Sequence, residues 1–97
     1  MELEHRINRG SRAKEIIENE IYQEAFEALE QEILLQWGES PARDQEGREK
    51  LYLMLGITRR VKAILQSVME TGKLAEVELL HRQTMLDRAK ETLADIW

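Results

Sequence analysis

The fold of this chain is decided by residues 45–71, which read QEGREKLYLMLGITRRVKAILQSVMET. Six side chains in this stretch, five of them apolar, recur three and four residues apart and form what we call the seam: Leu51, Met54, Thr58, Val61, Leu65 and Val68. This spacing places them on one side of an α-helix, where they can pack against another helix. With Asp44 as N-cap and Gly72 as C-terminal stop, the pattern predicts a helix from about Gln45 to Thr71, roughly 40 Å long.

Two more helices are expected on either side of this one. Residues 12–37 carry apolar side chains at helical spacing, namely Tyr22, Phe26, Leu29, Ile33 and Trp37. Asn19 either interrupts this helix or caps its second part, and Gly38 fits a left-handed residue that ends it. A third helix is expected from Lys73 to the C-terminus, with leucines at 79, 86 and 93 and Arg82 in place of a further apolar residue. Residues 1–11 are expected to form a flexible polar arm, and residues 12–97 one helical domain.

Charge predicts how the first two helices pair. Between Glu15 and Trp37 there are seven acidic residues and no basic one, whereas residues 43–62 carry six basic and three acidic residues. An antiparallel hairpin places these opposite charges side by side, although each exposed pair contributes only about 0–1 kcal/mol. A fold about residue 40 or 41 would place Glu30 near Leu51 and Glu20 near Val61.

Composition limits the functional class. The chain has 97 residues, a formal charge of −5, 34% charged and 5% aromatic residues, and no cysteine. The core must therefore be aliphatic, and disulfides and thiolate metal sites are excluded. Neither a signal peptide nor a membrane-spanning stretch is recognisable. We expect a protein without membrane contact, located in the cytoplasm and, if it is a phage protein, in the host cytoplasm or the virion.

No catalytic or metal-binding pattern is present. The two histidines, His5 and His81, have no neighbouring carboxylates in a metal-ligand pattern, and no glycine-rich phosphate loop exists. We therefore expect no enzymatic activity and no cofactor. The basic residues Arg6, Arg9, Arg12 and Lys14 could contact nucleic acid, but an ordinary solubilising segment explains them more simply.

The apolar content exceeds what one hairpin can bury. Extra apolar residues lie beside the seam, and two more, Ile96 and Trp97, end the chain. A homo-oligomeric helical bundle would cover them. The residues expected to make these contacts are Leu51, Met54, Val61, Leu65, Val68, Ile96 and Trp97.

A family resemblance covers residues 12–75. It rests on Ala13-Lys14, Asn19, Ala25-Phe26, Trp37, Pro41-Ala42-Arg43-Asp44, Gly47-Arg48-Glu49, Leu51, Val61, Leu65 and Thr71-Gly72-Lys73-Leu74-Ala75. In these residues the chain resembles small, mostly uncharacterised helical proteins of tailed bacteriophages and prophages. The resemblance implies a phage origin and a place in virion or head assembly, but it carries over no functional residue.

These observations lead to three functional hypotheses. The first is a non-enzymatic assembly or interaction protein that self-associates and contacts other phage structural proteins. The second is a nucleic-acid-associated factor, such as a small DNA-packaging subunit, that uses the basic N-terminal segment with Arg59 and Arg60. The third is an acidic inhibitor of a host protein. A defined oligomer without nucleic acid distinguishes the first hypothesis from the other two.

Overall fold

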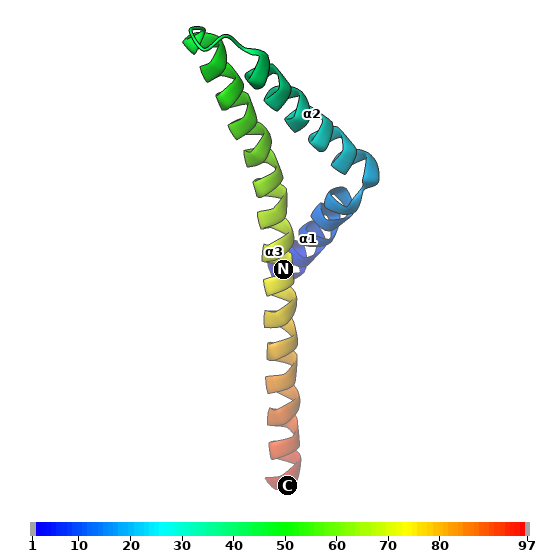
Figure 1. Ribbon diagram of the computed structural model, residues 1–97. Coiled ribbons are helices and arrows are strands. Elements are labelled where there is room, and N and C mark those ends of the chain that lie inside the picture. Colours follow the sequence, from blue (N-terminus) through cyan, green and yellow to red (C-terminus); the bar gives the residue numbers. More distant parts are fainter. Residues whose placement is uncertain (1, 97) are drawn as a thin grey trace.

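The computed structural model describes residues 2–96, and these residues form three α-helices without any strand (Figure 1). The helices are α1 (Glu2–Glu18), α2 (Glu20–Glu39) and α3 (Gln45–Ile96). The predicted all-α class is therefore confirmed. None of these helices is long and apolar enough to cross a membrane.

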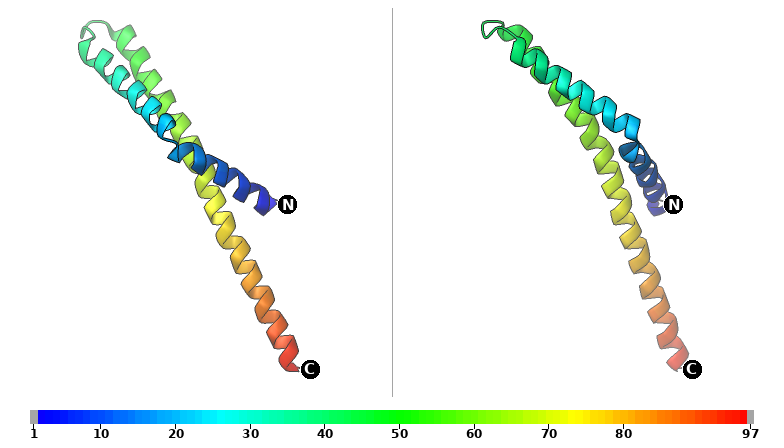
Figure 2. Two further views of the ribbon diagram at one scale, coloured as in Figure 1. Left: turned by 90° about the vertical axis from the view of Figure 1, so that its right-hand side faces the viewer. Right: turned by 45° about the vertical axis from the view of Figure 1, so that its right-hand side comes forward.

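Asn19 separates α1 from α2. Its backbone is extended, with φ −66° and ψ 124°, and its side-chain oxygen accepts a hydrogen bond of 2.9 Å from the backbone N–H of Tyr22. This is the geometry of an N-cap, in which a short polar side chain satisfies a free N–H of the first helical turn. The sequence left two roles open for Asn19, and it takes the capping role. The chain bends at this residue, so that α1 and α2 point in different directions (Figure 2).

The chain reverses direction between α2 and α3. Asp44 caps α3 as predicted, because its carboxylate accepts a hydrogen bond of 3.1 Å from the N–H of Gly47. The predicted stop at Gly38 is wrong: this glycine lies inside α2, and none of the glycines has a positive φ. The helix ends instead at Ser40, whose backbone is extended and whose N–H and hydroxyl both donate to the Trp37 carbonyl.

Arg48 fastens the end of α2 to the first turn of α3. Its guanidinium lies 4.3 Å from the centre of the Trp37 ring and donates to the Trp37 carbonyl and to the carbonyl and hydroxyl oxygens of Ser40. The first turn of α3 contacts the end of α2. Each residue of α2 therefore faces a residue further along α3 than predicted. Glu30 pairs with Lys62 at 3.6 Å rather than lying near Leu51, so the predicted register is wrong.

We expect Arg48→Ala to lower the free energy of unfolding by about 1–2 kcal/mol. The substitution removes a cation–π contact and leaves helix-end carbonyls without their donor. Lys50→Ala is the matched control: Lys50 forms only an exposed ion pair with Glu46 at 3.7 Å, which is worth about 0–1 kcal/mol. Urea unfolding followed by circular dichroism measures both. Equal effects would show that Arg48 does not hold the turn.

α3 is a single helix of 52 residues that continues through Gly72. The predicted stop at Gly72 and the separate third helix are therefore wrong. Residues 2–11 also differ from the expectation, because they belong to α1 and are not an unstructured arm. Both differences have one physical cause: α1 crosses α3 at Gly72, and this contact stabilises helix in both segments.

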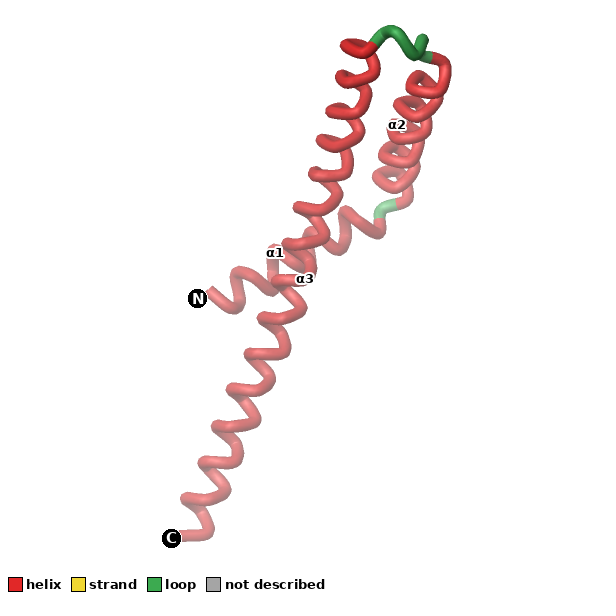
Figure 3. The backbone as a smooth tube through the Cα atoms, turned by 60° about the vertical axis from the view of Figure 1, so that its left-hand side comes forward, coloured by secondary structure: helices red, strands yellow, loops and turns green. Residues whose placement is uncertain are grey.

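The molecule is elongated and has a very small core. It measures 82 × 25 × 19 Å, with a radius of gyration of 22.5 Å, against about 13 Å for a compact domain of this length. Ala13, Ile33 and Ala75 are the only buried apolar side chains among the described residues. In the views of Figures 1 to 3, α2 lies beside one half of α3, α1 crosses its middle, and the C-terminal part of α3 extends alone.

Candidate interaction surface

Four small residues form the crossing of α1 and α3. Gly10 and Ala13 are the buried residues of α1, and Gly72 and Ala75 are buried on α3. A Cβ atom added to either glycine would lie 2.7 Å from the Cα of the other. The two backbones are therefore too close for any side chain at this point. The spacing Gly-x-x-Ala occurs once in α1 and once in α3. On each helix it leaves a flat surface, and the two helices pack closely through these surfaces.

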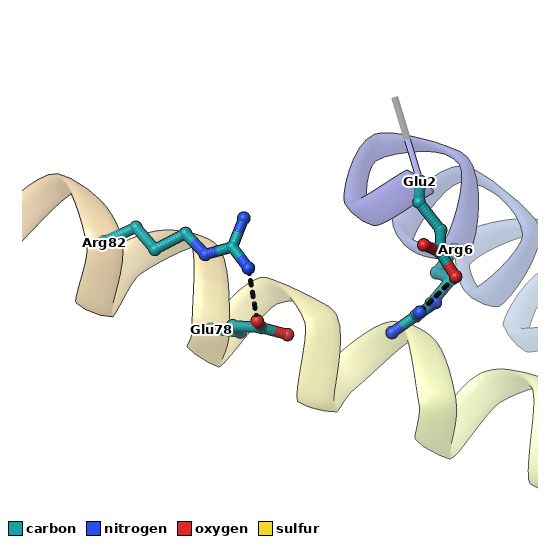
Figure 4. A network of polar contacts seen from close by, with 4 residues as sticks. All are labelled: Glu2, Arg6, Glu78 and Arg82. Atoms are coloured by element: carbon teal, nitrogen blue, oxygen red, sulfur yellow. Dashed lines mark hydrogen bonds and ion pairs between the residues drawn. The ribbon is translucent and has the colours of Figure 1, made fainter.

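A row of charges borders this crossing where the first turns of α1 approach α3. Arg6 pairs with Glu2 on α1, and Arg82 pairs with Glu78 on α3 at 2.7 Å (Figure 4). The hydrogen bond and charge of Arg6 lower the pKa of Glu2, and Glu2 in turn raises the pKa of Arg6. Leu3 and Leu79 lie between these pairs in a shallow groove of about 330 Å³. The charged residues thus frame the contact between the two helices.

The predicted contact residues divide into two groups. Leu51, Leu65 and Val68 are half-buried. Leu51 lines a small apolar groove with residues of α2, and Val68 lines a groove whose α1 side consists of His5, Arg6 and Arg9. Met54 and Val61 remain 47% and 42% exposed. Trp97 and the side chain of Ile96 lie outside the described part of the structure. The seam is therefore partly used within the chain and partly left open.

The exposed part of the seam continues into a larger apolar surface on α3, which we call the outer band. It consists of Leu53, Met54, Ile57, Val61 and Ile64, and each of these side chains is between 42% and 64% exposed. Their spacing puts them on one side of the helix. The band is separate from the side that meets α2, where Leu55 lines the groove with Ile33 and Lys62 pairs with Glu30.

In the part of the chain that the structure describes, no group of three histidine, aspartate or glutamate side chains could hold a metal ion. The sequence interpretation missed the crossing at Gly10 and Gly72, although the repeated Gly-x-x-Ala spacing was a signal for it.

Comparison with known proteins assigns this chain to no family. The chain matches no protein-family model, no curated protein and no solved structure.

Proposed function

We propose that this protein is a non-catalytic helical assembly protein that works by self-association. The observation that carries the proposal is the imbalance between its core and its surface. Three apolar side chains are buried, whereas seventeen large apolar side chains of the described residues are between 40% and 71% exposed. A protein that acts alone in water has no reason to keep so much apolar surface accessible.

The energetics support the same proposal. Each Å² of apolar surface that stays in water forgoes about 25 cal/mol of stabilisation. Chains of this size are only marginally stable even when they are compact. Because this chain is elongated, its own contacts contribute less still. Association with further copies is the commonest way in which proteins cover such surfaces.

The outer band is the first candidate for the contact between copies. In the proposed assembly, α2 and the facing half of α3 form an antiparallel hairpin, and hairpins meet through their outer bands in a helical bundle. The resemblance to phage proteins supports a setting in virion or head assembly, with other phage structural proteins as further partners.

We expect the double substitution Ile57→Gln with Ile64→Gln to lower the mass of the assembly. Glutamine keeps the helix propensity but removes the apolar contact. Leu74→Gln with Leu80→Gln is the matched control, because these side chains are 71% and 65% exposed but lie outside the outer band. Light scattering after size exclusion measures both masses. An unchanged mass in the first variant would contradict an interface at the outer band.

A second candidate function is binding to nucleic acid. Arg9, Arg12, Arg59 and Arg60 are all exposed, and none of them forms an ion pair within residues 2–96. Free arginines of this kind can neutralise phosphates. Adding duplex DNA to the purified protein distinguishes the two candidates. The assembly proposal predicts no change in mass, whereas a salt-sensitive complex would favour a packaging factor.

A further inference from the structure

We infer that the C-terminal part of α3, residues 80–95, pairs antiparallel with the same segment of a second copy. We call this segment the extension. The inference rests on the self-association proposed above and adds a second contact to it, distinct from the outer band.

The extension has no partner within its own chain. Every side chain from Leu80 to Asp95 is exposed, and this part of α3 lies away from α1 and α2 (Figures 1 and 3). Helices in proteins owe most of their stability to the packing of one face, and this segment packs against nothing in its own chain. A contact from outside the chain would therefore stabilise it.

The seam continues into the extension with the same spacing. Because α3 is a single helix, the series that begins at Leu51 proceeds in alternating steps of three and four through Gly72 and Ala75 and on to Leu79, Arg82, Leu86, Ala89 and Leu93. A sustained alternation of three and four is the pattern of a coiled coil. α1 covers Gly72 and Ala75, whereas Leu86 and Leu93 are 60% and 56% exposed. The extension thus presents the uncovered end of a coiled-coil seam.

The charges of the extension fit a second copy as the occupant. Residues 80–95 carry three basic and three acidic side chains, and their charges cancel: Arg82, Arg88 and Lys90 against Asp87, Glu91 and Asp95. Identical surfaces that carry a net charge repel each other. Two extensions carry no net charge and can therefore meet without this repulsion.

Arg82 favours the antiparallel direction. In a parallel pair in register, each Arg82 would face the partner's Arg82 across the contact, and two like charges would oppose each other. An antiparallel pair separates them. The groove that joins Leu3 to Leu79 marks where α1 begins to cover the seam, so a partner helix can reach no further than Leu79.

The pairing of large with small side chains sets the register, and it places the two-fold axis between Asp87 and Arg88. Leu86 then faces the partner's Ala89, a large side chain opposite a small one, as interlocking helices require. Leu93 lies against the aliphatic stem of the partner's Arg82.

One pair of molecules cannot make both contacts, the one between extensions and the one between outer bands. The middle of the outer band, near Ile57, lies about 45 Å along the helix from the proposed two-fold axis. Extensions therefore connect copies that the outer band does not connect. We expect the full assembly to be larger than the unit held by the outer band alone.

Spin labels on three single-cysteine variants test the pairing. The chain has no cysteine of its own, and His81, Arg88 and Asp95 are exposed and spaced seven residues apart, at equivalent positions of the repeat. The proposed register brings the two Arg88 sites level, whereas the two His81 sites and the two Asp95 sites are offset by about 20 Å along the axis. Pulsed electron spin resonance on the full chain should find the shortest distance at Arg88 and longer distances at the other two sites.

Equal distances at the three sites would indicate a parallel pair and overturn the inference. Absence of any measurable distance, with a mass that still exceeds the monomer, would overturn the inference and leave the proposed function standing. A monomeric mass would overturn both.

Substitutions in the extension give a second test. Leu86→Gln with Leu93→Gln should reduce the assembly to the unit held by the outer band. Leu74→Gln with Leu80→Gln, which removes apolar surface from other faces of α3, should leave the mass unchanged. Equal masses for the two double variants would contradict pairing through the seam.

Discussion

Gly72→Ala and Gly56→Ala should change the stability of this protein in opposite directions. The two glycines lie in the same helix and receive the same methyl group. At Gly56 nothing lies within 4 Å of the added Cβ, whereas at Gly72 the Cβ would lie 2.7 Å from the Cα of Gly10 and 3.0 Å from the Arg6 carbonyl oxygen. Backbone atoms at such distances cannot move aside without shifting α1. We expect Gly72→Ala to lower the free energy of unfolding by about 1–3 kcal/mol, the usual effect of overpacking.

Gly56→Ala is expected to raise that free energy by about 0.5–1 kcal/mol, because alanine loses less conformational entropy in a helix than glycine does. Urea unfolding followed by circular dichroism at a fixed protein concentration measures both variants. Stabilisation by both substitutions would mean that α1 does not pack on α3 at this point.

Ile33→Ala should be the most damaging truncation in α2. Ile33 is 3% exposed, and it is the only large apolar side chain among the buried residues of the described chain. Replacing a buried isoleucine with alanine lowers the free energy of unfolding by about 2–5 kcal/mol, and this loss includes the cost of the cavity left behind. The loss should be the largest for any truncation in α2, because no other large side chain of this helix is buried.

Leu35→Ala is the matched control for Ile33→Ala, since Leu35 is two residues away on the same helix and 61% exposed. Its effect should stay within about 0.5 kcal/mol. The comparison uses thermal and urea unfolding of both variants. Similar losses in the two variants would show that the face of α2 turned toward α3 is not the one described here.

Helix α2 and the first half of α3, with its N-cap Asp44, could be predicted from local sequence. The apolar spacing of α2 and of the seam identified both helices, and the capping role of Asp44 follows from its short carboxylate and its position before the first turn. These predictions succeed because they depend on residues within one or two turns of each other.

The errors arise where a distant contact decides the structure. Gly72 resembles a helix stop, but Gly10, far away in the sequence, turns it into a point of close approach inside a helix. Residues 2–11 look like a solvated segment until α3 provides the surface on which α1 packs. The register of α2 against α3 depends on Arg48, whose contact with Trp37 uses the first turn of α3.

The exposure of the predicted contact residues also depends on which parts of the chain cover them. Met54 and Val61 were expected to make contacts between chains, and they are exposed in the outer band. Leu65 and Val68 were expected to make such contacts too, but both are half-buried, and Val68 lines a groove with residues of α1. Helical spacing identifies which residues share a face, but it does not say whether the face is covered by the same chain or by another.

Sedimentation equilibrium of the intact chain tests self-association most directly. At tens of micromolar protein, we expect a mass of at least twice the monomer mass of 11.4 kDa, rising with concentration. The mass should change little between low and high salt, because the contact is mostly apolar and salt screens only charged contacts. A single species of monomer mass across the concentration range would contradict self-association and would point to a partner of a different kind.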